Sequence, residues 1–89
     1  MHSTDAYAAL AKELDAFRQL QWKELVALAD AKELASERSA EISGEPINLE
    51  IVVAWLDKEH AAIRITGHAR GSSTWHHEHL QENVIVHCP

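Results

Sequence analysis

The chain is poor in the residues that mark specialised scaffolds and common active sites. Its 89 residues include one cysteine, three glycines and two prolines. A single cysteine, Cys88, cannot form an internal disulfide, which excludes a small disulfide-stabilised scaffold. Three isolated glycines make no phosphate-binding loop, and the motifs Gly-x-Ser-x-Gly, His-Glu-x-x-His and Cys-x-x-Cys are all missing. The sequence therefore predicts a protein that is not an enzyme.

Long apolar runs and an excess of positive charge are missing as well. No stretch approaches the ~20 apolar residues of a membrane-spanning helix, and residues 1–5 lack the basic and apolar regions of a signal peptide. We therefore expect a cytoplasmic protein that does not bind membranes. The formal net charge of −6 repels phosphates, so direct binding of nucleic acid is not expected, whereas a protein partner with a basic surface is favoured.

What is present is the composition of a globular domain. Hydrophobic residues make up 46% of the chain and charged residues 25%, which separates it from disordered and low-complexity sequences. With 89 residues, the chain is predicted to form a single domain over residues 1–89. A domain of this size buries only a modest core.

Residues 5–42 are rich in alanine, leucine, glutamate and lysine, which favour helix. Their apolar side chains mostly follow one stripe at helical spacing, but Leu20, Trp22, Val26 and Leu34 lie off it. The sequence predicts one long helix or two nearly collinear helices, with a break near Leu20 and Trp22 or near Asp30. Alternatively, the residues off the stripe form a second apolar face that contacts another chain, and for this reason we expect a homodimer. Trp22 is then either an interface anchor or a core residue beside a bend.

After Gly44 the apolar residues change from helical to alternating spacing. The run Ile47–Leu56 is the most apolar stretch and carries branched and aromatic residues that suit a strand. One set of alternate positions in this run is apolar throughout. The other set begins polar and ends apolar, so the second half of the strand is expected to be covered on both sides.

The second half of the chain predicts a sheet of short strands joined by turns. Strands are expected at residues 47–57, 60–70, 74–80 and 84–88, with a turn at 81–83 between the last two. Residues 73–82 form a short helix in an alternative interpretation. The predicted fold is α+β, with an N-terminal helical layer at about 5–42 packed on an antiparallel meander of three or four strands.

Histidine is concentrated in the second half, where six of the seven histidines lie in residues 60–87. Imidazole is a common metal ligand, and residues two apart in a strand share a face. A zinc site is therefore an alternative hypothesis. Its ligands would come from His68, His77, His79 and His87. The spacing matches no named zinc signature, so the primary prediction is a solvated strand face with no metal and no cofactor.

No family is identified from these residues, so the functional prediction depends on size, charge and the missing motifs. In these features the chain resembles, as a class, phage-borne inhibitors such as anti-CRISPR proteins, and toxin-immunity proteins. The resemblance implies a small acidic domain that binds another protein and inhibits or neutralises it. The predicted contact residues lie on the second helix face and on the outer side of the second strand: Leu20, Trp22, Val26, His60, Arg64 and His68.

Two other functions are kept as alternatives. One is a histidine-rich zinc-binding protein or a small metalloenzyme. The other is a domain similar to cystatins or to nuclear transport factor 2, in which a curved sheet wraps a helix and encloses a small apolar ligand.

Overall fold

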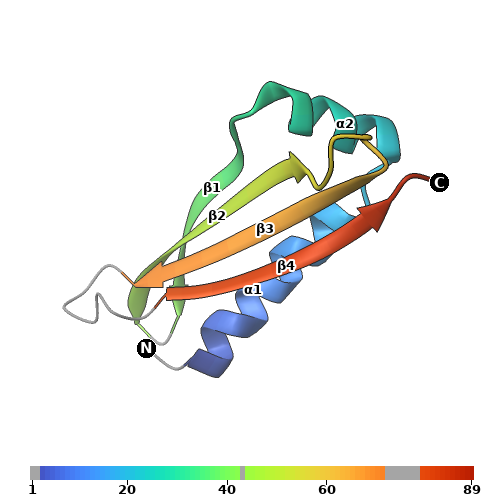
Figure 1. The fold of residues 1–89 in the computed structure, drawn as a ribbon. Helices are drawn as coiled ribbons and strands as arrows, with labels where there is room; N and C mark the ends of the chain where they lie inside the picture. Colours follow the sequence, from blue (N-terminus) through green and yellow to red (C-terminus); the bar gives the residue numbers. More distant parts are fainter. Residues whose placement is uncertain (1–2, 43, 72–78) are drawn as a thin grey trace.

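The structure, a computed structural model, describes residues 3–42, 44–71 and 79–89 (Figure 1). The elements in these ranges are α1 (Ser3–Arg18), α2 (Trp22–Ala31), β1 (Leu34–Ile42), β2 (Glu45–Trp55), β3 (Ala62–Gly71) and β4 (His79–His87). The four strands form one antiparallel sheet in the order β1-β2-β3-β4. This confirms the predicted α+β architecture, with helices first and a meander after them. Neither of the described helices is long and apolar enough to cross a membrane.

The helical half is interrupted at the first of the two positions where a break was predicted. Helix α1 ends at Arg18, and Gln21 adopts an extended backbone (φ −69°, ψ 153°) before α2 begins at Trp22. Helix α2 ends just after Asp30, where Lys32 takes a left-handed conformation at φ 56°. Figure 1 shows α2 running in a different direction from α1, so the two helices are not collinear. This change of direction brings α1 against β3 and β4, and α2 against β2.

The prediction of helix as far as residue 42 is wrong, because Leu34–Ile42 forms strand β1. This strand pairs with β2 over its whole length. Helix preferences of ordinary residues differ by only about 0.7 kcal/mol. The hydrogen bonds and packing offered by the neighbouring strand therefore override them. Gly44, at φ 82°, turns the chain between the two strands, whereas the sequence placed the end of a helix there.

The end of the chain also differs from the prediction. The described parts of the strands expected at 74–80 and 84–88 belong to the single strand β4, which continues through the turn predicted at 81–83. The polar residues of that predicted turn stay extended because they pair with β3. The alternative helix at 73–82 is excluded for the part that lies in β4. Residues 72–78 lie outside the described ranges.

The core lies between the two helices and one face of the sheet. The strands predicted at 47–57 and 60–70 correspond to β2 and β3, which pair from Ile47↔Gly71 to Trp55↔Ile63. Almost fully buried aliphatic side chains from both helices and both central strands fill this space. They are Leu10, Leu14, Leu25, Ala29, Ile47, Leu49, Ile51, Val53, Ile63 and Ile65.

Gly67 sets how closely α1 approaches the sheet. A Cβ atom at this position would lie 2.7 Å from Leu10 Cδ1 and 3.1 Å from Leu14 Cγ. Real Cβ atoms do not come this close to a neighbour, so the missing side chain makes room for the helix. Because α1 is seated this tightly, one face of the sheet is occupied and the other remains available for contacts.

Candidate functional site

The sheet has a face covered by the helices and a face on the other side, which we call the open face. Side chains alternate between the two faces of a strand. On β2 the odd-numbered positions Ile47–Val53 are nearly fully buried and the even-numbered positions are partly exposed. The burial of β3 alternates in the same way. The open-face residues, matched through the strand register, are Glu37, Ser39, Asn48, Glu50, Val52, Ala54, Arg64, Thr66, His68, Arg70, Gln81, Asn83 and Ile85.

One end of the open face is apolar. Among the described residues, four large hydrophobic side chains are exposed, and three of them belong to this end. They are Leu34 at the start of β1 (48% exposed), Leu56 just after β2 (42%) and Ile85 on β4 (41%). The backbone N–H of Leu56 donates to the carbonyl of Ala62, which continues the ladder between β2 and β3 and keeps Leu56 on the open face. We call these three residues, with Val52 and Ala54, the apolar end.

Arg64 is the charged residue in the middle of the apolar end. In the strand register it lies between Ala54 of β2 and Ile85 of β4. Its side chain is exposed. An arginine surrounded by apolar side chains is typical of the centre of a protein interface, where it pairs with a carboxylate or stacks on an aromatic ring.

A hollow of about 510 Å³ adjoins the apolar end. It arises because β2 continues to Trp55, whereas its pairing with β1 begins only at Leu34↔Val52. The end of β2 therefore has no β1 residue beside it, and the side chains around the gap are largely apolar. The lining residues are Ala29, Lys32, Glu33, Leu34, Val52, Val53, Ala54 and Trp55.

The indole of Trp55 forms a fixed wall of this hollow. Its Nε1–H donates to Asp30 Oδ1 at 2.9 Å, which ties the end of β2 to the end of α2. The ring of Trp22 meets it edge-on, with centroids 5.9 Å apart and planes at 69°. The ring of His60 stacks on it at 4.2 Å and 9°. Three contacts of this kind hold the indole in one orientation, so the wall is preorganised for a ligand or a partner side chain.

The other end of the open face is polar and contains a poorly paired carboxylate. Glu50 is cross-strand from Glu37 on one side and His68 on the other. Its side chain is only 15% exposed, and Arg70 Nη1 lies 3.5 Å from its Oε1. No donor in the described ranges hydrogen-bonds this buried oxygen atom. Two carboxylates directly opposite each other repel, which disfavours this arrangement in the isolated sheet.

The predicted contact residues are divided among three places. Arg64 and His68 lie on the open face, as expected from the alternation of the second predicted strand. His60 lies in the loop after β2, exposed and stacked on Trp55. The remaining three are partly buried and pack against the core of their own chain: Leu20, Trp22 and Val26. Their apolar surface is largely used within the fold, so our functional proposal is built on the open face.

The sequence interpretation did not single out Leu56 and Ile85. It placed Leu34 among the apolar residues off the helical stripe, on a segment that it interpreted as helix. Leu56 gave a usable signal, because the alternate positions of the run Ile47–Leu56 end in apolar residues. Ile85 belongs to a run of three branched residues, but which of them point outward depends on the register with β3.

The alternative zinc site depends on histidines that the register separates. His68 pairs with Gln81, and His87 pairs with Ala62. The two histidine positions are therefore six residues apart along the β3–β4 ladder, or about 20 Å, so one ion cannot bind both. His77 and the imidazole of His79 lie outside the part of the chain that the structure describes. Among the described residues, no group of three or more His, Cys, Asp or Glu side chains is placed to hold a metal ion.

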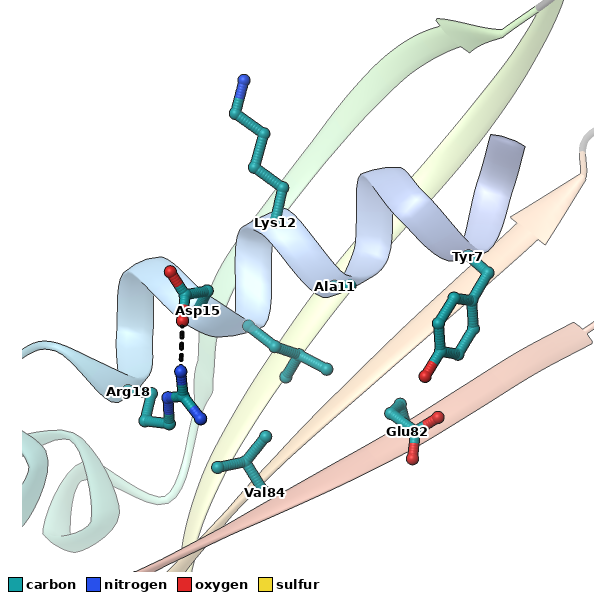
Figure 2. Close-up of a pocket in the computed structure, with 8 residues that line it drawn as sticks. Tyr7, Ala11, Lys12, Asp15, Arg18, Glu82 and Val84 are labelled. Carbon is teal, nitrogen blue, oxygen red and sulfur yellow. Dashed lines mark hydrogen bonds and ion pairs between the residues drawn. The ribbon is translucent and has the colours of Figure 1, made fainter. Parts of the chain in front are cut away.

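A second hollow of about 510 Å³ lies between α1 and β4 on the covered side (Figure 2). In Figure 2 the phenol of Tyr7 and the carboxylate of Glu82 point toward each other. A hydrogen bond to Glu82 and the negative charge of that carboxylate raise the pKa of Tyr7 above its usual value of 10.0. Arg18 Nη2 and Asp15 Oδ1 pair at 2.6 Å on the same helix. These charged and polar groups satisfy one another, so this hollow is less suited to an apolar partner than the one beside Trp55.

The chain matches no protein-family model, no curated protein and no solved structure. Its function is therefore inferred from the geometry of the open face.

Proposed function

We propose that this protein is a non-enzymatic binding domain that docks on another protein through the apolar end of its open face and inhibits that protein by covering it. The observation that carries the proposal is the position of Leu34, Leu56 and Ile85. They come from separate parts of the chain, yet all three are exposed at the same end of one sheet face, around Arg64. Exposed apolar residues gathered in this way mark an interaction surface.

The size of the apolar end decides what else the interface needs. Burying the exposed part of a leucine or isoleucine side chain contributes about 1 kcal/mol, so the three residues contribute about 3 kcal/mol. Association costs at least about 4 kcal/mol in lost translational and rotational freedom. The apolar end therefore requires further contacts for stable binding, and Arg64 and the adjoining hollow supply them.

The hollow beside Trp55 is the place for an anchor side chain of the partner. Its volume of about 510 Å³ is ample for one aromatic residue, and residues that fill such pockets carry most of the binding energy of an interface. A partner with a basic surface overall approaches faster because this chain carries a formal charge of −6. A carboxylate within that surface would pair with Arg64.

The experiment is site-specific photo-crosslinking in the cell that makes the protein. A photoreactive residue replaces Ile85 in one version and Tyr7, the fourth exposed large apolar residue, in the matched control on α1. We expect a crosslinked partner from position 85 and none, or far less, from position 7. The crosslink at 85 should fall at least about tenfold when Leu34 and Arg64 are changed to serine and glutamate, because the same surface is altered.

Circular dichroism melting of each version shows that the fold is intact. Equal crosslinking from positions 85 and 7, or a crosslink that survives the changes at Leu34 and Arg64, would overturn the proposal.

A small apolar ligand in the hollow beside Trp55 is the second candidate function. The hollow has a volume within the range of about 300–1,000 Å³ that is typical of ligand sites. Here Ala54→Trp, which fills the hollow, should abolish the fluorescence change of Trp55 on addition of the ligand. Ala27→Trp, on the exposed surface of α2, serves as the control. Delipidated protein that shows no such change with any apolar ligand tested would exclude this candidate.

A further inference from the structure

We infer that a second copy of this chain binds the open face, with the two sheets face to face and the two-fold axis parallel to the strands. This inference goes beyond the proposed function: the second copy uses the same surface, so it competes with the other protein for the open face. Three features of the open face carry it: the division of its charges, the position of its apolar end and the carboxylate of Glu50.

Acidic and basic side chains occupy different halves of the open face. The acidic residues Glu37 and Glu50 lie on β1 and β2. The arginines Arg64 and Arg70 lie on β3, and the imidazole of His68 is on the same strand. A face divided in this way complements itself when a rotation brings the acidic half of one copy over the basic half of the other.

Charge selects one of the two possible axes. A two-fold axis parallel to the strands places β1 over β4 and β2 over β3 of the second copy, so Glu50 on β2 faces the basic side chains of β3. An axis across the strands would place each strand over itself, and the acidic strands would repel. The first axis keeps each position along the strands at the same height in both copies. The apolar ends, including Leu34 and Ile85, therefore meet each other and exclude water together.

The same axis places the polar ends in register. Glu50 of one copy then lies over β3 of the other, near the arginine and imidazole groups of that strand. Its carboxylate, which has Arg70 Nη1 of its own chain 3.5 Å from Oε1 and is 15% exposed, gains further positive neighbours in this arrangement. The repulsion between Glu50 and Glu37 across the β1–β2 ladder is also reduced by the positive groups opposite.

The area of the face predicts a weak dimer. Four strands about 4.8 Å apart and about 30 Å long present roughly 570 Å² per copy, or about 1,100 Å² in total. Specific interfaces begin at about 1,000–1,200 Å². We therefore expect dimerisation at micromolar concentrations, with a dissociation constant that responds to salt because part of the binding is electrostatic.

Sedimentation equilibrium over about 1–500 µM tests this expectation. The wild-type chain should dimerise within this range. Ile85→Ser should weaken the dimer at least about tenfold, and so should Glu50→Arg, which places a positive charge over the basic side chains of β3. Tyr7→Ser, which removes an equally exposed residue from α1, should leave the dissociation constant unchanged.

Mixing experiments test the charge pairing and the axis. The variant with Glu50→Arg should recover a dimer when mixed with the variant carrying His68→Glu and Arg70→Glu, because β2 of one copy lies over β3 of the other. For the axis, Leu34→Cys and Asn83→Cys are placed in separate chains that also carry Cys88→Ser. Only the mixture should form an intermolecular disulfide, because β1 of one copy lies over β4 of the other.

The outcomes separate this inference from the proposed function. A chain that stays monomeric at about 500 µM overturns the inference, while crosslinking from position 85 to another protein still supports the docking function. A dimer that is insensitive to Ile85→Ser, or equal disulfide formation by Leu34→Cys alone, also overturns the inference.

Discussion

The two faces of the sheet follow different rules. On the covered face, the odd-numbered positions of β2 from Ile47 to Val53 are all aliphatic and almost fully buried. Position 67 of β3 is a glycine because Leu10 of α1 leaves no room there for a side chain. On the open face, neighbouring positions of the same strands are polar at one end and apolar at the other. Folding accounts for the first face, because packing against the helices requires every one of its residues.

This difference shows where function is to be sought. A sheet packed on one side is stable with a polar second side, so folding does not require exposed leucine and isoleucine on the open face. Exposed apolar side chains also favour aggregation, which gives a reason to exclude them unless they serve an interface. The residues of the open face are therefore the place to look for binding, whereas the residues of the covered face are explained by stability.

The largest difference between the two faces is expected when the same substitution, isoleucine to alanine, is made on each of them. Ile51→Ala, at a fully buried position of the covered face, should lower the free energy of unfolding by about 2–5 kcal/mol. Ile85→Ala on the open face should change it by no more than about 0.5 kcal/mol at concentrations where the chain is monomeric. Urea unfolding followed by Trp fluorescence measures both. Equal losses would show that the open face also contributes to the fold.

A smaller effect is expected from closing the gap between α1 and the sheet. Gly67→Ala should cost about 1–3 kcal/mol, because its methyl group would collide with the side chain of Leu10. Leu10→Ala removes the obstacle, so the double variant should lose less stability than the two single losses added together. A double variant with strictly additive losses would mean that Gly67 is required for another reason.

The smallest effect concerns the polar rim of the covered face. Tyr7 is the only tyrosine in the chain, so the ultraviolet absorbance of its phenolate can be titrated directly. The hydrogen bond to Glu82 and the charge of that carboxylate raise the pKa of Tyr7. Glu82→Gln should lower the midpoint toward the ordinary value of 10.0, since the amide keeps a hydrogen-bond acceptor but removes the charge.

The direction of the stability change with pH follows from this raised pKa. The contact between Tyr7 and Glu82 stabilises the fold fully below the pKa of tyrosine in the unfolded chain and loses its contribution as the pH rises through the higher folded value. If the phenolate of Tyr7 titrates with the same midpoint in the wild type and in Glu82→Gln, the contact with Glu82 is not the cause of the raised pKa.

Several parts of the fold follow from local patterns. The alternating apolar residues of Ile47–Leu56 predicted the central strand, and the interruption of the helical stripe near Trp22 predicted the break between α1 and α2. In each case the signal lies in residues a few positions apart, so the chain alone contains it. The outward position of Arg64 and His68 was predictable for the same reason.

Other parts do not follow from local patterns. The segment Leu34–Ile42 has ordinary helix-forming residues, and β4 contains a polar stretch that resembles a turn. Both are strands because a neighbouring strand supplies hydrogen bonds along their whole length. A weak local preference gives way to such pairing, and the pairing partners lie from 3 (Ile42↔Glu45) to 25 (Ala62↔His87) positions away in the sequence.

The sequence by itself determined the class of the fold, the central strand and the acidity of the chain, because composition and short-range periodicity are properties of the chain before it folds. Only the tertiary structure decided that Leu34, Leu56 and Ile85 share one end of one face and that acidic and basic strands divide that face. The physical reason is the register of the sheet. Which side chains become neighbours depends on how strands pair, and a shift of one residue would move each of them to the opposite face.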